Sequence, residues 1–281
     1  MREITCKKIT AAVKELCIEA AYYLPEDMKE SLRRMEENEE HALGKKVLGD
    51  LLKNLEIAEK DMIPICQDTG MAVFFIELGQ DVHITGGDLE EAVNRGVAEG
   101  YNEGYLRKSV VKDPLERENT KDNTPAIIHL KMVPGEGFKI TLAPKGFGSE
   151  NMSRVIMLKP ADGYEGIKKA VVDTIISAGA NACPPMFVGV GIGGDFELCA
   201  LMAKHALTLE EQDMEHAPEY ARRLAEEIKE EANRSGIGPA GLGGGSTVTG
   251  VRIETYPTHI AGLPVGVNIC CHANRHASKE I

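Results

Sequence analysis

The sequence predicts an α+β fold in which mixed antiparallel sheets are surrounded by helices, with a helical N-terminal region. Strand-like runs occur in hairpin-like pairs, and long helices lie between them without the repeating strand-helix unit of a parallel sheet. The chain of 281 residues, with 43% hydrophobic and 27% charged residues, can bury a sizeable core. We expect one continuous domain overall, with a helical region at residues 1–62 and the main part at residues 63–281.

Composition excludes several classes of partner. The net charge of −12 argues against nucleic acid and anionic membranes, because both are bound by clustered Lys and Arg. No apolar run is long enough to span a membrane, and residues 1–8 become charged too soon for a secretory signal, so we expect a cytoplasmic protein. The seven scattered cysteines include no CxxC pair, which argues against a disulfide framework or a zinc ribbon.

The first sixty residues carry apolar side chains at helical spacing, in two stretches separated by Pro25. The helices end at Pro64, and residues 66–70 (Cys-Gln-Asp-Thr-Gly) follow immediately, before a strand-like run at residues 71–76. Consecutive thiol, amide, carboxyl and hydroxyl groups indicate a loop that carries chemistry, and an ordinary polar turn with a buried thiol is the alternative.

The next segment begins with a clear helix start, where Asp88 is the predicted N-cap and Glu91 completes a capping box. This helix should end near residue 104, and Arg107 beyond it either binds a carboxylate or caps the helix. The charged and turn-rich residues 113–125 predict a surface loop. The alternating runs at residues 126–133 and 138–142 predict a hairpin.

Three glycine-bearing segments follow. Residues 145–151 suit either an anion or a tight strand-to-helix connection. Gly189, Gly191 and Gly194 have the spacing of a dinucleotide fingerprint, but the chain after them does not continue as a Rossmann unit, so they indicate a helix packed closely on a strand. Residues 236–247 are glycine-rich but lack the lysine of a phosphate-binding loop.

Cysteines stand at the edges of regular elements in three loops, at Cys66, at Cys183 before two prolines, and at Cys270 and Cys271. Their long separation in sequence indicates a site that the tertiary fold assembles. Six motifs in order then resemble the iron-sulfur class I fumarate hydratases and their tartrate dehydratase relatives. The motifs are Ile-Cys-Gln-Asp-Thr-Gly at 65–70, Lys-Gly-x-Gly-Ser at 145–149, Ala-Cys-Pro-Pro at 182–185, Gly-Leu-Gly-Gly at 241–244, His-Ile-Ala-x-Leu-Pro at 259–264 and Cys-His-Ala at 271–273.

This resemblance implies a 4Fe-4S cluster held by three cysteines, with one iron left open as a Lewis acid for a substrate carboxylate and hydroxyl. The implied ligands are Cys66, Cys183 and Cys271, with Cys270 as the reserve candidate. The implied catalytic residues are Asp68, as an acid that assists the hydroxyl, and His259, for which a packing role is the alternative. The implied substrate-binding residues are Gln67, Arg107 and Gly148.

The expected function is that of the alpha subunit of a two-subunit hydro-lyase that reversibly hydrates fumarate to L-malate. A dehydratase for L-tartrate or another hydroxydicarboxylate is the alternative, and a non-enzymatic iron-sulfur redox sensor is a distant one. Single-chain members of the family carry a further C-terminal domain, so we expect a beta subunit to complete the active site and this chain to be inactive alone. The other expected partners are a small dicarboxylate substrate and a second alpha chain, as a homodimer or an α2β2 assembly.

Overall fold

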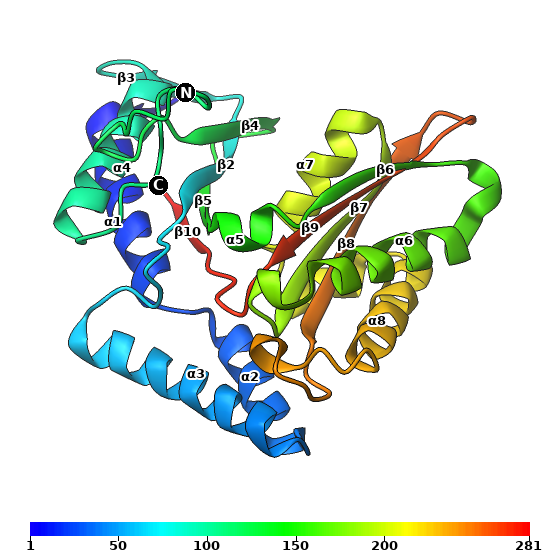
Figure 1. Ribbon diagram of the computed structural model, residues 1–281. Coiled ribbons are helices and arrows are strands. Elements are labelled where there is room, and N and C mark those ends of the chain that lie inside the picture. The colour runs from blue at the N-terminus through cyan, green and yellow to red at the C-terminus, as the bar shows by residue number, and fades with distance from the viewer. The chain divides into compact units, whose positions relative to one another are not determined.

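The computed structural model describes residues 1–281 and divides the chain into two compact units (Figure 1). Unit 1 contains Met1–Pro25, Asn54–Phe147 and Arg275–Ile281, and unit 2 contains Glu26–Lys53 and Gly148–Asn274. Helices surround mixed sheets, so the predicted α+β class is confirmed. The predicted helical region at residues 1–62 is divided between the units, and its separate role stays a prediction.

The main sheet of unit 1 has the strand order β10-β5-β2-β4. Its strands are β2 (Met71–Gly79), β4 (Ile127–Val133), β5 (Phe138–Lys145) and β10 (Ala277–Glu280). A separate parallel pair joins β1 (Arg2–Thr5) to β3 (Val82–Thr85).

The hairpin predicted for residues 126–142 is wrong, because β2 lies between β4 and β5, parallel to one and antiparallel to the other. The connecting turn crosses the end of β2 at Gly79, where a Cβ atom would lie 2.3 Å from the carbonyl oxygen of Gly135. Local alternation specifies a strand and its buried face, but not which strand becomes its neighbour.

Two helices complete the core of unit 1, α1 (Cys6–Tyr22) and α4 (Leu89–Glu103). The side chain of Asp88 accepts the N–H of Glu91, which confirms the predicted N-cap of α4. Cys17 of α1 is buried in this core. Burial also raises the pKa of the Cys17 thiol, because the thiolate loses its hydration.

Unit 2 is built on a four-stranded sheet of order β6-β9-β7-β8. The strands are β6 (Arg154–Leu158), β7 (Met186–Gly194), β8 (Val248–Thr258) and β9 (Leu263–Cys270). The helices α6 (Gly163–Ala178) and α8 (Glu219–Asn233) cover one face, and α7 (Phe196–Ala206) covers the other (Figure 1). The remaining elements are α2 (Glu26–Asn38), α3 (Ala42–Asp61), α5 (Phe147–Glu150) and the 3₁₀ segments Pro160–Asp162, Gly179–Ala182, Glu211–His216 and Pro239–Gly241.

Alternation along β7 explains the glycines that imitate a dinucleotide fingerprint. Val188 and Val190 point into the core beneath α6 and α8, whereas a Cβ on Gly191 would lie 2.2 Å from the carbonyl oxygen of Cys199 in α7. A Cβ on Gly266 of β9 would lie 2.3 Å from the same oxygen. The interpretation of these glycines as close helix-strand packing is therefore confirmed.

None of the helices is both long and apolar enough to cross a membrane.

Candidate functional site

The loop at residues 66–70 is organised by the carboxylate of Asp68. One carboxylate oxygen accepts the N–H of Gly70 at 3.0 Å, and the other accepts the N–H of Phe147 at 3.1 Å. Gly70 has a φ of +81°, and a Cβ there would lie 2.8 Å from the backbone nitrogen of Lys145. Only glycine therefore allows the loop to approach the end of β5.

Two buried side chains that carry no recognisable motif hold the same loop. The hydroxyl of Tyr101 lies 3.0 Å from the carbonyl oxygen of Thr69 and 2.9 Å from that of Gly70, and the Asn123 amide donates to the Gly70 oxygen at 3.2 Å. Burial raises the pKa of Tyr101, so its hydroxyl remains a neutral donor. Asn123 is fully buried and also accepts the N–H of Ser109, so the prediction of a surface loop is wrong at this residue.

Arg107 lies beside the loop, and its guanidinium donates to the side-chain oxygen of Gln67 at 2.8 Å. The Thr69 hydroxyl donates to the carbonyl oxygen of Arg107 at 3.1 Å, which connects the segment after α4 to the loop. Both Gln67 and Arg107 are exposed. This pair presents amide and guanidinium groups to solvent, a combination that can bind a carboxylate.

A third buried contact comes from Arg275, whose Nη2 donates to the carbonyl oxygen of Asp68 at 2.8 Å. The side chain is 3% exposed, and its Nε and Nη1 atoms have no hydrogen-bond partner. Unit 1 therefore brings together Cys66, Gln67, Asp68 and Arg107 from the predicted set, and adds Arg275, which sequence reasoning missed.

In unit 2, the loops of Cys183 and Cys271 are neighbours. Cys183 has a φ of +51°, and its carbonyl oxygen accepts the N–H of His272 at 3.4 Å. Gly148 lies near this pair, since a Cβ there would be 3.9 Å from the carbonyl oxygen of Asn181. Three of the predicted site residues thus meet at one end of the unit 2 sheet.

His259 lies elsewhere in unit 2. It is exposed in the turn between β8 and β9, where its Nδ1 accepts the N–H of Ala261. Phe187 of β7 pairs with Cys270, whereas Gly194, seven residues further along β7, pairs with Thr258. At the usual rise of a strand, roughly 23 Å separates His259 from the cysteine end of the sheet.

Burial separates the seven cysteines into two groups. Cys183 is exposed, and Cys66 and Cys271 are half-buried, whereas the other four (Cys6, Cys17, Cys199 and Cys270) are buried. Cys270 is the last residue of β9 and lies within the sheet, which favours Cys271 as the ligand of the pair. Thiolates are the usual ligands of iron-sulfur clusters, so the three cysteines that are not fully buried have the chemistry that such a group needs. No set of three His, Cys, Asp or Glu side chains in the structure is close enough to hold a metal ion.

The glycine-rich segment at residues 236–247 supports the Cys183 loop. Its Ala240 N–H donates to the carbonyl oxygen of Pro184 at 2.8 Å, and a Cβ on Gly241 would lie 2.4 Å from the Cβ of Ala180. The segment is in turn held by Glu39, which follows α2 directly and is 6% exposed. Glu39 accepts N–H groups from His41 at 3.0 Å, Gly245 at 3.2 Å and Ser246 at 2.9 Å.

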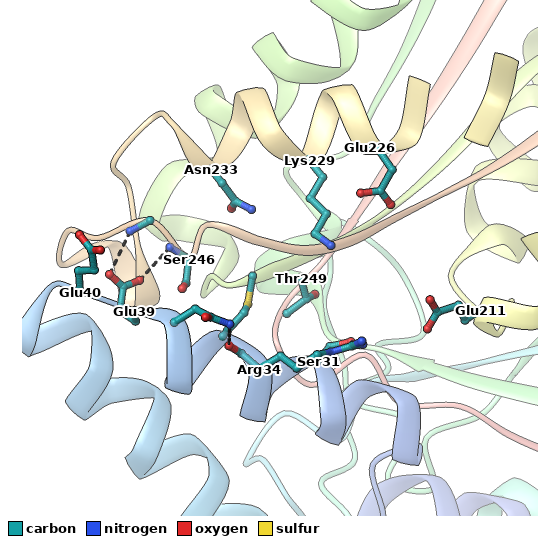
Figure 2. Close-up of a pocket in the computed structure, with 13 residues that line it drawn as sticks. Ser31, Arg34, Glu39, Glu40, Glu211, Glu226, Lys229, Asn233, Ser246 and Thr249 are labelled. Carbon is teal, nitrogen blue, oxygen red and sulfur yellow. Dashed lines mark hydrogen bonds between the residues drawn. The ribbon is translucent and has the colours of Figure 1, made fainter. Parts of the chain in front are cut away.

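Figure 2 shows Glu39 joined by a hydrogen bond to Ser246. Glu39, Gly245 and Ser246 line a cavity of about 650 Å³. Burial acts to raise the pKa of Glu39, but the hydrogen bonds that stabilise its carboxylate outweigh burial and lower it. The cavity lies between α2, α8 and the glycine-rich segment and contains none of the predicted site residues. Glu39 therefore has a structural role in supporting the Cys183 loop.

The matching family model and the similar proteins belong to the same family. The family model described as "Fumarate hydratase (Fumerase)" matches residues 10–280. A Methanocaldococcus jannaschii protein provisionally named L(+)-tartrate dehydratase subunit alpha is 41% identical over 280 residues, or 98% of both chains. The L(+)-tartrate dehydratase subunit alpha of Escherichia coli strain UTI89 is 31% identical over 278 residues, covering 98% of this chain and 91% of the relative.

The family match covers nearly the whole chain, in agreement with the six motifs. Both relatives are named as alpha subunits of tartrate dehydratases, which favours the tartrate alternative over the expected fumarate hydration. The chain belongs to the family of fumarate hydratases and tartrate dehydratase alpha subunits, and is a hydro-lyase of that family.

Proposed function

We propose that this chain is the alpha subunit of an iron-sulfur dehydratase that removes water from L(+)-tartrate. The observation that carries the proposal is the 41% identity to a relative with that name over 98% of both chains. Loss of a hydroxyl from one carbon and a proton from the next gives an enol, which becomes oxaloacetate when a proton moves from oxygen to carbon. Hydration of fumarate is the second candidate, because the matching family is described by that activity.

A 4Fe-4S cluster on Cys66, Cys183 and Cys271 is part of this proposal, supported by the exposure of Cys183 and the partial exposure of the other two cysteines. When bound, it supplies an open iron as a Lewis acid at the hydroxyl that departs. Arg107 binds one substrate carboxylate through its planar fork, and Gln67, which accepts a hydrogen bond from Arg107, orients that fork. The backbone of Gly148 contributes to substrate binding beside the Cys183 loop.

In this proposal Asp68 both shapes its loop and acts as an acid. Both of its oxygens accept backbone N–H groups, so the carboxylate already shapes the loop that carries Cys66. To protonate the departing hydroxyl, Asp68 must carry a proton, on a lone pair that its two N–H donors leave free. Asp68→Asn should therefore weaken the loop as well as lower turnover, and the stability of the variant must be measured beside its activity.

Two partners complete the proposed enzyme. The relatives are named as alpha subunits, which supports a separate beta subunit that carries the rest of the active site. The second partner is another copy of this chain. Because His259 lies roughly 23 Å along the unit 2 sheet from the cysteines, it reaches a cysteine site only from a neighbouring alpha chain. This separation supports an alpha homodimer or an α2β2 assembly.

The test is anaerobic co-expression with the product of the adjacent open reading frame, followed by assays of L(+)-tartrate dehydration and fumarate hydration. We expect the highest kcat/KM for L(+)-tartrate, and no turnover by the alpha chain alone. A higher kcat/KM for fumarate would make fumarate, rather than L(+)-tartrate, the substrate. A stable iron-sulfur spectrum without turnover of any dicarboxylate would favour the sensor instead.

A further inference from the structure

We propose that Glu150, Lys204 and Asn268 form a positioning network, which fixes the backbone of Gly148 relative to the strand that leads to Cys271. This inference rests on the proposed function, because it assumes that Gly148 binds the substrate. All five residues belong to unit 2. None of the three network residues is among the site residues that the sequence predicts.

The first argument is that the three side chains bind one another in a closed ring. The Lys204 ammonium donates to one carboxylate oxygen of Glu150 and, at 3.1 Å, to the amide oxygen of Asn268. The Asn268 amide nitrogen donates to the other carboxylate oxygen of Glu150 at 2.9 Å. Asn268 is buried, and the side chains of Lys204 and Glu150 are 18% and 21% exposed. An ion pair that is largely removed from water and also hydrogen-bonded holds its groups in one geometry, whereas an exposed pair contributes little.

The second argument is the set of elements that the ring connects. Glu150 is the last residue of α5, two residues after Gly148. Lys204 lies on α7, and Asn268 lies on β9, three residues before Cys271. The network therefore connects the segment that carries Gly148 to the strand that carries a proposed cysteine ligand.

The close packing of α7 on the sheet makes this connection possible. Gly189 of β7 pairs with Asn268, and a Cβ atom on Gly189 would lie 2.0 Å from the carbonyl oxygen of Ala203. Because α7 approaches the sheet beside Asn268, the next residue of the helix, Lys204, reaches the amide.

Ser153 supplies a second connection between the same two segments. Its hydroxyl oxygen accepts the Asn268 amide at 2.7 Å and the N–H of Ile269 at 3.0 Å. Its own N–H donates to the carbonyl oxygen of Glu150 at 3.1 Å. The end of α5 is thus bound to β9 through both its side chain and the backbone that follows it.

The position of Gly148 distinguishes a positioning role from general stabilisation. A Cβ atom on Gly148 would lie 3.9 Å from the carbonyl oxygen of Asn181, in the segment that precedes Cys183. Gly148 therefore lies beside one cysteine loop of unit 2, while Glu150 is bound to the strand that leads to the other. The network determines where the backbone of Gly148 lies between these two loops.

Loss of the network should weaken substrate binding more than turnover. Glu150→Gln preserves the shape of the side chain but removes the charge that binds Lys204, and Lys204→Met removes the ammonium. Displacing a group that binds the substrate and the transition state equally raises KM and leaves kcat unchanged. Each variant should raise KM by roughly tenfold, the effect of one hydrogen bond to a charged group, and change kcat by less than about twofold. The double variant should have the KM of the single variants, not a roughly hundredfold increase, because both substitutions break the same connection.

The experiment uses the full-length chain, co-expressed with the product of the adjacent open reading frame and kept anaerobic. The measurements are kcat and KM for L(+)-tartrate and fumarate, hydrogen exchange of residues 148–153, and urea unfolding. The matched control is Lys168 with Glu227, a Lys–Glu contact of 3.3 Å between α6 and α8 in the same unit. Lys168→Met and Glu227→Gln should affect unfolding alone, whereas the network variants should also accelerate exchange at residues 148–153.

If Glu150→Gln does not fold, Lys204→Met decides. Network variants with the KM of the wild type, or with a lower kcat at an unchanged KM, would overturn the positioning role and leave the proposed function intact. An equal rise of KM in the control variants would also overturn it. A wild type that turns over neither dicarboxylate would overturn the proposed function and, with it, this inference.

Discussion

Replacement of Glu39 by Gln tests the support of the Cys183 loop most directly. The carboxylate accepts three backbone N–H groups, from His41, Gly245 and Ser246, at 2.9–3.2 Å. A glutamine retains one acceptor oxygen, and its NH2 group must face an N–H donor. Hydrogen bonds to charged groups contribute about 1.5–3 kcal/mol each, and a buried donor without a partner costs about 1–3 kcal/mol. We therefore expect Glu39→Gln to lower the free energy of unfolding by about 3 kcal/mol at pH 7.

The pH dependence of this loss follows from the lowered pKa of Glu39. A carboxyl group whose pKa is lower in the folded state stabilises the fold fully above its unfolded pKa, and this contribution is lost as the pH falls through the folded pKa. The difference between wild type and Glu39→Gln should therefore be constant near neutral pH. It should shrink as the pH falls below the pKa of an unfolded glutamate, about 4.3, towards the lower pKa of the folded state.

The assay is urea unfolding monitored by circular dichroism between pH 3 and pH 8, with hydrogen exchange of residues 236–247 as the local measurement. Glu40→Gln is the matched control, because Glu40 is the next residue, lines the same cavity and is exposed. We expect faster exchange in the glycine-rich segment for Glu39→Gln only. Equal stability of the two variants at pH 7, or a difference that does not shrink at low pH, would refute the reasoning.

Three further substitutions test the site. Tyr101→Phe should destabilise unit 1 by about 1 kcal/mol in urea unfolding and reduce iron binding on reconstitution, whereas Tyr22→Phe, which removes a similar buried bond to Gly104, should affect stability alone. Equal iron binding by both variants would contradict a role of Tyr101 in the loop. Cys271→Ser should abolish the iron-sulfur absorbance, and Cys270→Ser should retain it. The reverse result would make Cys270 the ligand in place of Cys271. Mixed refolding of Cys271→Ser and His259→Asn chains with the beta subunit should restore about a quarter of wild-type activity if His259 acts across a dimer, and none if it acts within its own chain.

Local sequence patterns predicted the regular elements well. The N-cap at Asp88 and the buried face of α1 depend on residues within one or two helical turns, and both are observed. The glycines of β7 were also interpreted correctly, because the absence of a continuing Rossmann unit is visible in the chain order. The pairing of β4 and β5 was wrong, since alternation in a strand says nothing about a third strand that inserts between them.

The sequence by itself determined the family, the loops that carry chemistry and the three candidate cysteines, because motifs preserve chemical groups at fixed spacing. Only the tertiary structure decided that Cys271 rather than Cys270 leaves the sheet, and that His259 lies at the other end of it. Only the tertiary structure brought Arg275 to Asp68, 207 residues earlier in the chain. Contacts across such distances are specified by the packing of whole elements, and no local pattern records them.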